Sequence, residues 1–169
     1  VNNYDGRETA PSAVDENLFQ TSAGADMAFY DAVVGGKSVG VPGVVSMLAL
    51  AHKREGKLPW AELFQPAIAL ADNGFAISPR LNSLLAGEKY LNKDDAAKAY
   101  FYDADGTTPK AAGSTLKNPE YAKVLRIIAK QGAKGFYTGE VAKAIVAKVN
   151  SHPTNPGTMT LKDMAGYQA

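Results

Sequence analysis

Few residues in this sequence could carry acid–base or metal chemistry. His52 and His152 are its two histidines and cysteine is absent, so a zinc site would need carboxylate ligands, and no recognisable spacing provides them. We interpret His52 as a cation near a helix end and His152 as a solvated loop residue. The serines are dispersed, and no Gly-x-Ser-x-Gly motif is present. Composition and spacing therefore supply no complete active site, and they predict neither a metal nor a cofactor.

Two short motifs are similar to ligand-binding loops but lack residues that such loops need. Residues 36–38 (Gly-Lys-Ser) match the end of a phosphate loop, but Asp31 stands where the first glycine is required. Residues 103–106 (Asp-Ala-Asp-Gly) match part of a calcium loop, but Ala112 stands where the bidentate glutamate belongs. The Asp-Gly pair, preceded by two aromatic residues at 101 and 102, instead predicts a β-hairpin.

Composition and charge narrow the class of protein. With 46% hydrophobic and 21% charged residues, the 169-residue chain should fold, and its length suits one domain. The formal charge of +1 gives no field that would gather nucleic acid or anionic lipid. We therefore expect no nucleic-acid partner. No apolar run approaches the roughly 18 residues of a membrane span, so we also expect no membrane span.

Helix signals dominate after residue 43. Apolar residues at helical spacing predict a helix over 44–55, with Gly56 ending it in left-handed geometry. Prolines, capping residues and glycines predict the other helices, which are two short ones between residues 60 and 74, one from 79 to about 90, one over 94–100, one from 119 to 132, one capped by Thr138, and one starting at Thr160 with a capping box. We therefore predict a mainly α fold with a few short strands, mostly helical over 43–169.

The beginning of the chain differs from the rest. Residues 1–11 have no helical period, and residues 4–9 predict a strand whose alternation sends Arg7 and Glu8 to opposite faces. One strand cannot make a sheet, so its neighbours are expected upstream of residue 1. We interpret residues 1–169 as a single partial domain in which 1–11 belongs to an incomplete sheet.

Ordered sequence blocks along almost the whole chain carry a family resemblance. They are residues 5–11 (Asp-Gly-Arg-Glu-Thr-Ala-Pro), 35–43 (Gly-Gly-Lys-Ser-Val-Gly-Val-Pro-Gly), 56–68 around Leu-Pro-Trp and Phe-Gln-Pro, 132–139 (Gly-Ala-Lys-Gly-Phe-Tyr-Thr-Gly) and 160–167 (Thr-Leu-Lys-Asp-Met-Ala-Gly-Tyr). Together these blocks resemble the large subunit of the γ-glutamyltransferase family, also called γ-glutamyltranspeptidase.

The resemblance implies a fold, an activity and a partner. It implies the αββα fold of N-terminal-nucleophile hydrolases, and a precursor that cleaves itself to free a threonine at the start of a small subunit. That threonine would attack the γ-glutamyl amide of glutathione-like substrates and pass the glutamyl group to an amino acid, a peptide or water. The threonine-rich start of the small subunit has no match here and is expected beyond Ala169. We therefore assign no catalytic residue in this chain, expect the chain alone to be inactive, and expect a periplasmic or secreted enzyme.

One substrate-binding residue follows from the resemblance. It implies that Arg7 binds the substrate's α-carboxylate, with Glu8 in a supporting role that orients or neutralises the guanidinium. The planar guanidinium suits this task because its fork can make two charge-assisted bonds to a carboxylate. Without the resemblance, Arg7 would be interpreted as a surface cation. It cannot be the nucleophile or general base, because it stays protonated at any ordinary pH.

Two alternatives remain open from the sequence. A glutaryl or cephalosporin acylase of the same fold would cleave a different acyl amide. A non-catalytic helical interaction module would keep the packing of the family without an active partner. The stretches 33–35 and 151–157 look variable in the family and give no site assignment.

Overall fold

The computed structural model describes residues 2–169 in two compact units. Unit 1 joins the chain up to Phe64 with Val124–Ala169, and unit 2 is Gln65–Lys123. Of the described residues, 51% are helical, and they contain two strands of two residues each. The predicted mainly α class with few short strands is confirmed, whereas the single partial domain stays a prediction.

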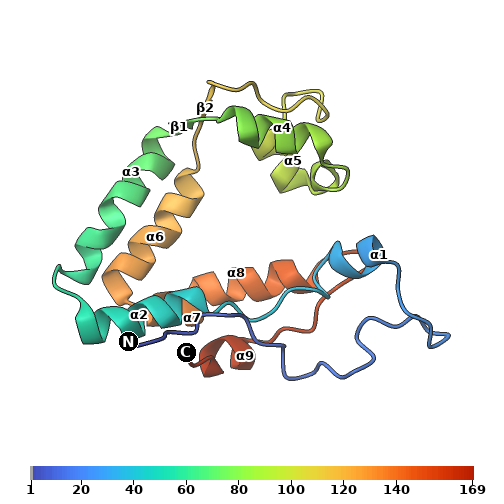
Figure 1. Ribbon diagram of the computed structural model, residues 1–169, viewed down its shortest axis with the longest axis horizontal. Helices are drawn as coiled ribbons and strands as arrows, with labels where there is room; N and C mark the ends of the chain where they lie inside the picture. Colours follow the sequence, from blue (N-terminus) through green and yellow to red (C-terminus); the bar gives the residue numbers. More distant parts are fainter. Residues whose placement is uncertain (1) are drawn as a thin grey trace. The chain divides into compact units, whose positions relative to one another are not determined.

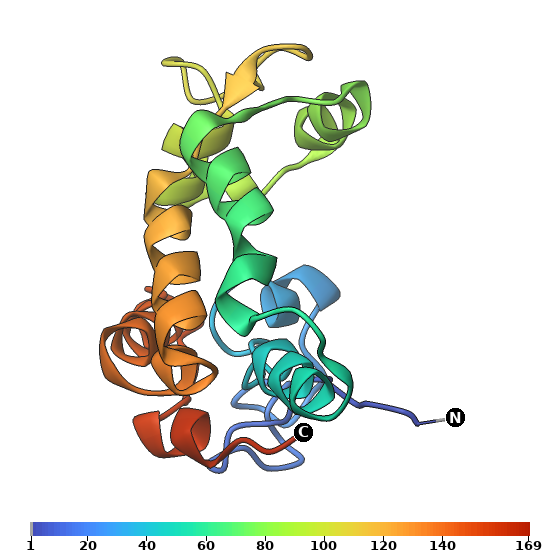
Figure 2. The ribbon, with the colours of Figure 1, turned by 90° about the vertical axis from the view of Figure 1, so that its left-hand side faces the viewer.

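Unit 1 has no helix in residues 2–28 and is mostly helical after them. Its elements are α1 (Phe29–Val33), α2 (Val44–Glu55), η1 (Trp60–Phe64), α7 (Lys134–Tyr137), α8 (Gly139–Asn150) and α9 (Leu161–Gly166), and α6 (Pro119–Gln131) enters it from unit 2. Residues 2–12 run between α2 and α9, and α9 lies beside α8 (Figures 1 and 2). The N-terminal segment is therefore held by elements from both halves of the chain.

The core of unit 1 gathers apolar side chains from α7, α8, α9 and the segment before α2. Its buried members are Val41, Tyr137, Ala142, Val149, Met159 and Met164. Val141 and Val149 face inward from α8, while Ile145 is half-buried against the same core. The apolar face predicted from the four-residue spacing of these three residues is therefore confirmed.

The helix ends lie close to where the sequence predicts them, but the predicted roles of Gly56 and Thr138 are wrong. α2 has the predicted bounds, but Gly56 has φ −66° and not the left-handed geometry expected. Its N–H donates to His52 O at 2.8 Å, and the His52 ring packs where a Cβ would stand, so glycine is needed here for space. Thr138 precedes α8 without a side-chain cap bond, and its hydroxyl is turned back to donate to Lys134 O at 2.8 Å. The capping box of α9 is present as predicted, between Thr160 and Asp163.

The N-terminal segment is less regular than predicted. Val1 lies outside the described residues, residues 2–8 carry no strand, and Thr9 forms one isolated antiparallel bridge with Val41. The predicted alternation of Arg7 and Glu8 across two faces of a strand is absent, because these residues form no strand, and their side chains form an ion pair. Membership of a larger sheet stays a prediction.

Unit 2 is built around a short antiparallel strand pair. Its elements are α3 (Gln65–Asn73), β1 (Phe75–Ala76), α4 (Pro79–Gly87), η2 (Leu91–Lys93), α5 (Asp95–Phe101), β2 (Thr115–Leu116) and the first turns of α6. Phe75 pairs with Leu116 and Ala76 with Thr115. The predicted break near Pro66 is confirmed as the boundary between η1 and α3.

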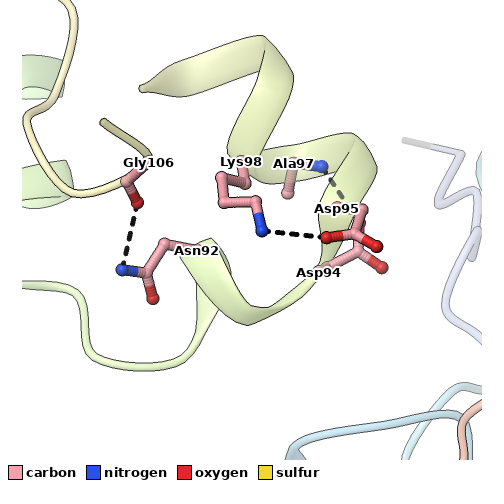
Figure 3. Close-up of polar contacts among 6 residues, drawn as sticks. All are labelled: Asn92, Asp94, Asp95, Ala97, Lys98 and Gly106. Atoms are coloured by element: carbon pink, nitrogen blue, oxygen red, sulfur yellow. Dashed lines mark hydrogen bonds and ion pairs between the residues drawn. The ribbon is translucent and has the colours of Figure 1, made fainter. Parts of the chain in front are cut away.

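The predicted hairpin after α5 is present only as a single antiparallel bridge that closes a loop. Asp94 caps α5 by accepting from Ala97 N–H at 2.9 Å, and Asn92 donates to Gly106 O at 3.4 Å (Figure 3). Phe101 belongs to α5, so only one bridge remains, between residues 102 and 109. The Thr108 hydroxyl and the N–H groups of residues 107 and 108 bond to Asp105, and these bonds lower the pKa of that carboxyl to about 2. The Asp105 carboxylate thus holds the tip of the loop, and its two ends are joined by backbone bonds from Asp103 N–H to Thr108 O at 2.8 Å and from Lys110 N–H to Phe101 O at 3.0 Å.

No helix in the described part of the chain is both long and apolar enough to cross a membrane.

Candidate functional site

The backbone around Arg7 is held by hydrogen bonds. Arg7 N–H donates to Asp5 Oδ1 at 2.9 Å, and Arg7 O accepts from the Tyr167 hydroxyl at 2.6 Å. Thr9 exchanges two backbone bonds with Val41, with N–O distances of 3.3 and 2.8 Å. The segment that carries the predicted substrate residue is therefore fixed before and after Arg7.

Close packing against α2 adds to this fixation. A Cβ on Gly6 would stand 2.8 Å from Met47 Cβ, which is nearer than real Cβ atoms approach one another. A Cβ on Gly43 would overlap both the Tyr167 hydroxyl and the Arg7 carbonyl oxygen. The glycines at 6 and 43 thus let the N-terminal segment and Tyr167 reach the start of α2.

Tyr167 rests on a second tyrosine that is itself bonded to α2. The rings of Tyr137 and Tyr167 stack with centroids 5.8 Å apart and an interplanar angle of 5°. The Tyr137 hydroxyl donates to Pro42 O at 2.7 Å and accepts from Ser46 N–H at 3.1 Å. Burial raises the pKa of Tyr137, so its hydroxyl keeps its proton and remains a donor at neutral pH.

The side chains of Arg7 and Glu8 are open to solvent. Arg7 is 80% exposed and Glu8 56% exposed, and Arg7 Nε lies 3.4 Å from Glu8 Oε1. An exposed pair of this kind contributes about 0–1 kcal/mol to stability. Guanidinium has five N–H donors, so the contact with Glu8 leaves donors available for a ligand carboxylate. The structure thus brings the two predicted site residues together on the surface of unit 1.

An open hollow of about 240 Å³ lies on the α9 side of the segment. Its lining includes Thr9, Ser12, Asp163 and Tyr167, but neither Arg7 nor Glu8. The hollow is therefore adjacent to the predicted carboxylate contact and does not contain it.

Neither histidine belongs to this site. His52 Nε2 lies 2.8 Å from Leu58 O, and its ring meets Trp60 edge to face at 5.2 Å. His152 lies in a loop as predicted and is half-buried, and its Nδ1 accepts from Asn155 N–H at 3.0 Å. Among residues 2–169, no group of three or more His, Asp or Glu side chains could hold a metal ion.

The sequence patterns do not identify the residues that hold the N-terminal segment in place. Tyr137, Tyr167 and Asp163 lie in blocks that carry the family resemblance, but no short-range pattern links them to a residue about 130 to 160 positions earlier. Asn155 was also missed, since its loop gave no site assignment. It is 5% exposed and bonds to the end of α1. Only contacts over long sequence separations identify these residues.

Acid is expected to loosen the contact between the N-terminal segment and α9. Asp163 accepts from Ser12 N–H at 3.0 Å and from Thr160 N–H at 2.8 Å, and bonds from Thr160 and Ser12 lower its pKa well below the ordinary 3.8. A carboxyl with a lowered folded-state pKa contributes stability that is full above its unfolded pKa and is lost as the pH falls through the folded value. We expect Asp163→Asn to lose less stability than wild type as the pH falls, because the amide does not titrate.

Thermal midpoints of both proteins between about pH 2 and pH 7 would check this. The difference between wild type and Asp163→Asn should narrow steadily below about pH 4. A difference that stays constant with pH would contradict the role given to the Asp163 carboxylate.

Residues 1–169 match the family described as Gamma-glutamyltranspeptidase. The chain belongs to the γ-glutamyltranspeptidase family. Glutathione hydrolase proenzyme from Pseudomonas aeruginosa is 36% identical over 169 residues, covering 97% of this chain and 28% of that protein. Across the first curated relatives it matches, the chain spans about a quarter of their length.

Solved structures agree with this γ-glutamyltranspeptidase assignment. Helicobacter pylori γ-glutamyltranspeptidase matches with a TM-score of 0.87 and 33% identity, over 97% of this chain and 46% of that one. Cephalosporin acylase from Bacillus halodurans matches with a TM-score of 0.77 and 26% identity, over 98% of this chain and 31% of that one. The predicted N-terminal-nucleophile hydrolase class is confirmed, and the family's fold is shared with an acylase.

Proposed function

We propose that this chain is part of a γ-glutamyltransferase in which Arg7 binds the α-carboxylate of a γ-glutamyl substrate. The enzyme would cleave the γ-glutamyl amide of glutathione-like compounds and transfer the glutamyl group to an amino acid, a peptide or water. The observation that carries the proposal is an 80% exposed guanidinium on a backbone that is bonded on both sides. Family membership supplies the reaction class.

The chemistry of Arg7 suits recognition and not bond cleavage. Guanidinium can donate two parallel hydrogen bonds to a carboxylate, which fixes orientation as well as charge. Glu8, 3.4 Å away, would balance the charge of Arg7 when no substrate is bound. An incoming α-carboxylate would then compete with Glu8 for the guanidinium. Arg7 would thereby hold the glutamyl end while another part of the enzyme acts on the γ-amide.

The nucleophile is proposed to come from a small subunit made from the same precursor. The Pseudomonas aeruginosa relative is itself called a proenzyme, which supports processing of this kind. The family also supports export of the enzyme to the periplasm or the outside of the cell.

The isolated 169-residue chain is expected to release no detectable product from a chromogenic γ-glutamyl anilide. The reason is that none of its residues matches the threonine nucleophile or the oxyanion donors implied by the family. The assay uses purified chain beside the full-length processed enzyme as positive control. Turnover that survives further purification and scales with the amount of this chain would overturn the assignment of catalysis to the small subunit.

A glutaryl or cephalosporin acylase is the second candidate, favoured by the match to the Bacillus halodurans enzyme. A glutaryl anilide keeps the carboxylate of a γ-glutamyl anilide and lacks only the α-amino group, so Arg7 would serve either substrate. Rates on the two anilides with the full-length protein distinguish the candidates. Preference for γ-glutamyl supports the proposal, and preference for glutaryl supports the acylase. A full-length protein that neither cleaves itself nor turns over either anilide would be the non-catalytic helical module.

A further inference from the structure

We propose that Tyr167 is a positioning residue for substrate binding, because it fixes the backbone carbonyl of Arg7. The inference rests on the proposed role of Arg7 and adds to it a residue 160 positions away in the sequence. The contact is a hydrogen bond from the Tyr167 hydroxyl to Arg7 O, with an O–O distance of 2.6 Å. The bond therefore fixes the backbone to which the Arg7 side chain is attached.

The support for Tyr167 comes from two directions. On one side its ring stacks on Tyr137, whose hydroxyl is bonded to Pro42 O and Ser46 N–H at the start of α2. On the other side it directly follows α9, where Met164 is fully buried and the Thr160 capping box is closed. Tyr167 is therefore held by α9 and by α2 through Tyr137, and a shift of either element would move the carbonyl to which it donates.

The Arg7 side chain needs a fixed backbone because it is itself 80% exposed and free to change rotamer. Within residues 2–169 the guanidinium forms an ion pair with Glu8, which is itself 56% exposed. A long side chain in solvent samples many rotamers, and each rotamer is carried along by any motion of the backbone beneath it. Bidentate carboxylate binding requires both bonds at once. Fixing the backbone thus raises the fraction of conformers that can bind the substrate.

The test uses Tyr167→Phe in the full-length processed enzyme, which removes the hydroxyl and keeps the ring for stacking. Steady-state kinetics are measured on a γ-glutamyl anilide and on the same anilide with its α-carboxylate converted to the carboxamide. For the carboxylate substrate we expect KM to rise about 2- to 10-fold, the loss typical of one neutral hydrogen bond. The kcat for this substrate and the constants for the carboxamide should stay near wild type.

Tyr102→Phe is the matched control. Tyr102 is buried in unit 2, and its hydroxyl donates to a backbone carbonyl, that of Leu85, at 3.2 Å. Its loss should lower the thermal midpoint without changing the ratio of the two KM values. Tyr167→Leu, which loses the stack as well, should raise the KM for the carboxylate substrate further than Tyr167→Phe does.

The outcomes separate this inference from the proposed function. If Arg7→Ala removes the preference for the carboxylate substrate and Tyr167→Phe lowers it, both stand. If Arg7→Ala removes the preference and Tyr167→Phe leaves it intact, or changes both substrates equally, Tyr167 is only structural and the inference is overturned. If Arg7→Ala itself leaves the preference intact, the proposed role of Arg7 fails, and the inference fails with it.

Discussion

Replacing Arg7 by alanine in the full-length enzyme is expected to lower kcat/KM for γ-glutamyl substrates by about 30-fold to several thousandfold. Arg7 is 80% exposed in this chain, and in the enzyme–substrate complex we expect the substrate and the rest of the enzyme to exclude water from its contact with the α-carboxylate. Loss of one partner from such a desolvated, hydrogen-bonded charge pair costs about 2–5 kcal/mol, because the other charge is left unpaired. A change of about 1.4 kcal/mol in the activation free energy corresponds to a tenfold change in rate. Arg7→Lys should recover only part of the loss, since ammonium is a point charge without the planar fork of guanidinium.

The decisive measurement pairs this variant with a change in the substrate. Anilides with an amidated α-carboxylate should already be poor substrates, and Arg7→Ala should lower their kcat/KM little further. The difference between the two losses is the coupling energy of the contact. Self-cleavage of the precursor should survive in Arg7→Ala, because it requires no free substrate. Equal proportional losses on both substrates would mean that Arg7 acts through folding or general charge, and its assignment to the carboxylate would be withdrawn.

Short-range sequence signals predicted the helices well because their causes lie within a few residues. The proline at 119 and the glycine at 132 bracket α6, and Gly132 has φ +66° as a helix-ending glycine should. The box between Thr160 and Asp163 was predicted from spacing alone and is closed in the structure. The errors also have local causes. The Thr138 hydroxyl is turned back toward Lys134 O, to which it donates, and Phe101 belongs to the end of α5.

The site could be predicted only in part, because its support is not local. The resemblance supplied Arg7, but the alternation predicted for a strand would have separated its side chain from that of Glu8. The bond from Tyr167 to Arg7 O joins residues 160 positions apart. Such a pairing depends on how α9 packs beside α8 and not on residue spacing, so no periodicity reports it. The loop over 151–157 shows the same limit, since its sequence suggested only a variable connection.

Asn155 in that loop is expected to be among the most sensitive residues of unit 1. It is 5% exposed, and its Nδ2 lies 3.0 Å from Asp31 O and 2.8 Å from Val34 O, with Ala32 O at 3.4 Å. The last carbonyl groups of a helix have no partner within the helix, and this one amide bonds to those of Asp31 and Val34, while the Ser38 hydroxyl donates to Val33 O at 2.6 Å. Asn155→Ala should therefore lower the free energy of unfolding by about 2–4 kcal/mol, through two lost bonds and carbonyls left unpaired.

Urea denaturation of full-length wild type and variants would measure this loss, with Asn150→Ala as the matched control. Asn150 is exposed and its Nδ2 donates to one carbonyl, Met159 O, at 2.9 Å, so its loss should cost about 1 kcal/mol or less. Asn155→Asp keeps the shape but directs carboxylate oxygens at carbonyl oxygens. The folded state should therefore favour the protonated acid and raise its pKa, so this variant should gain stability relative to wild type as the pH falls. If Asn155→Ala were no more destabilising than Asn150→Ala, or if Asn155→Asp showed no such gain in acid, the end of α1 would not depend on the Asn155 amide.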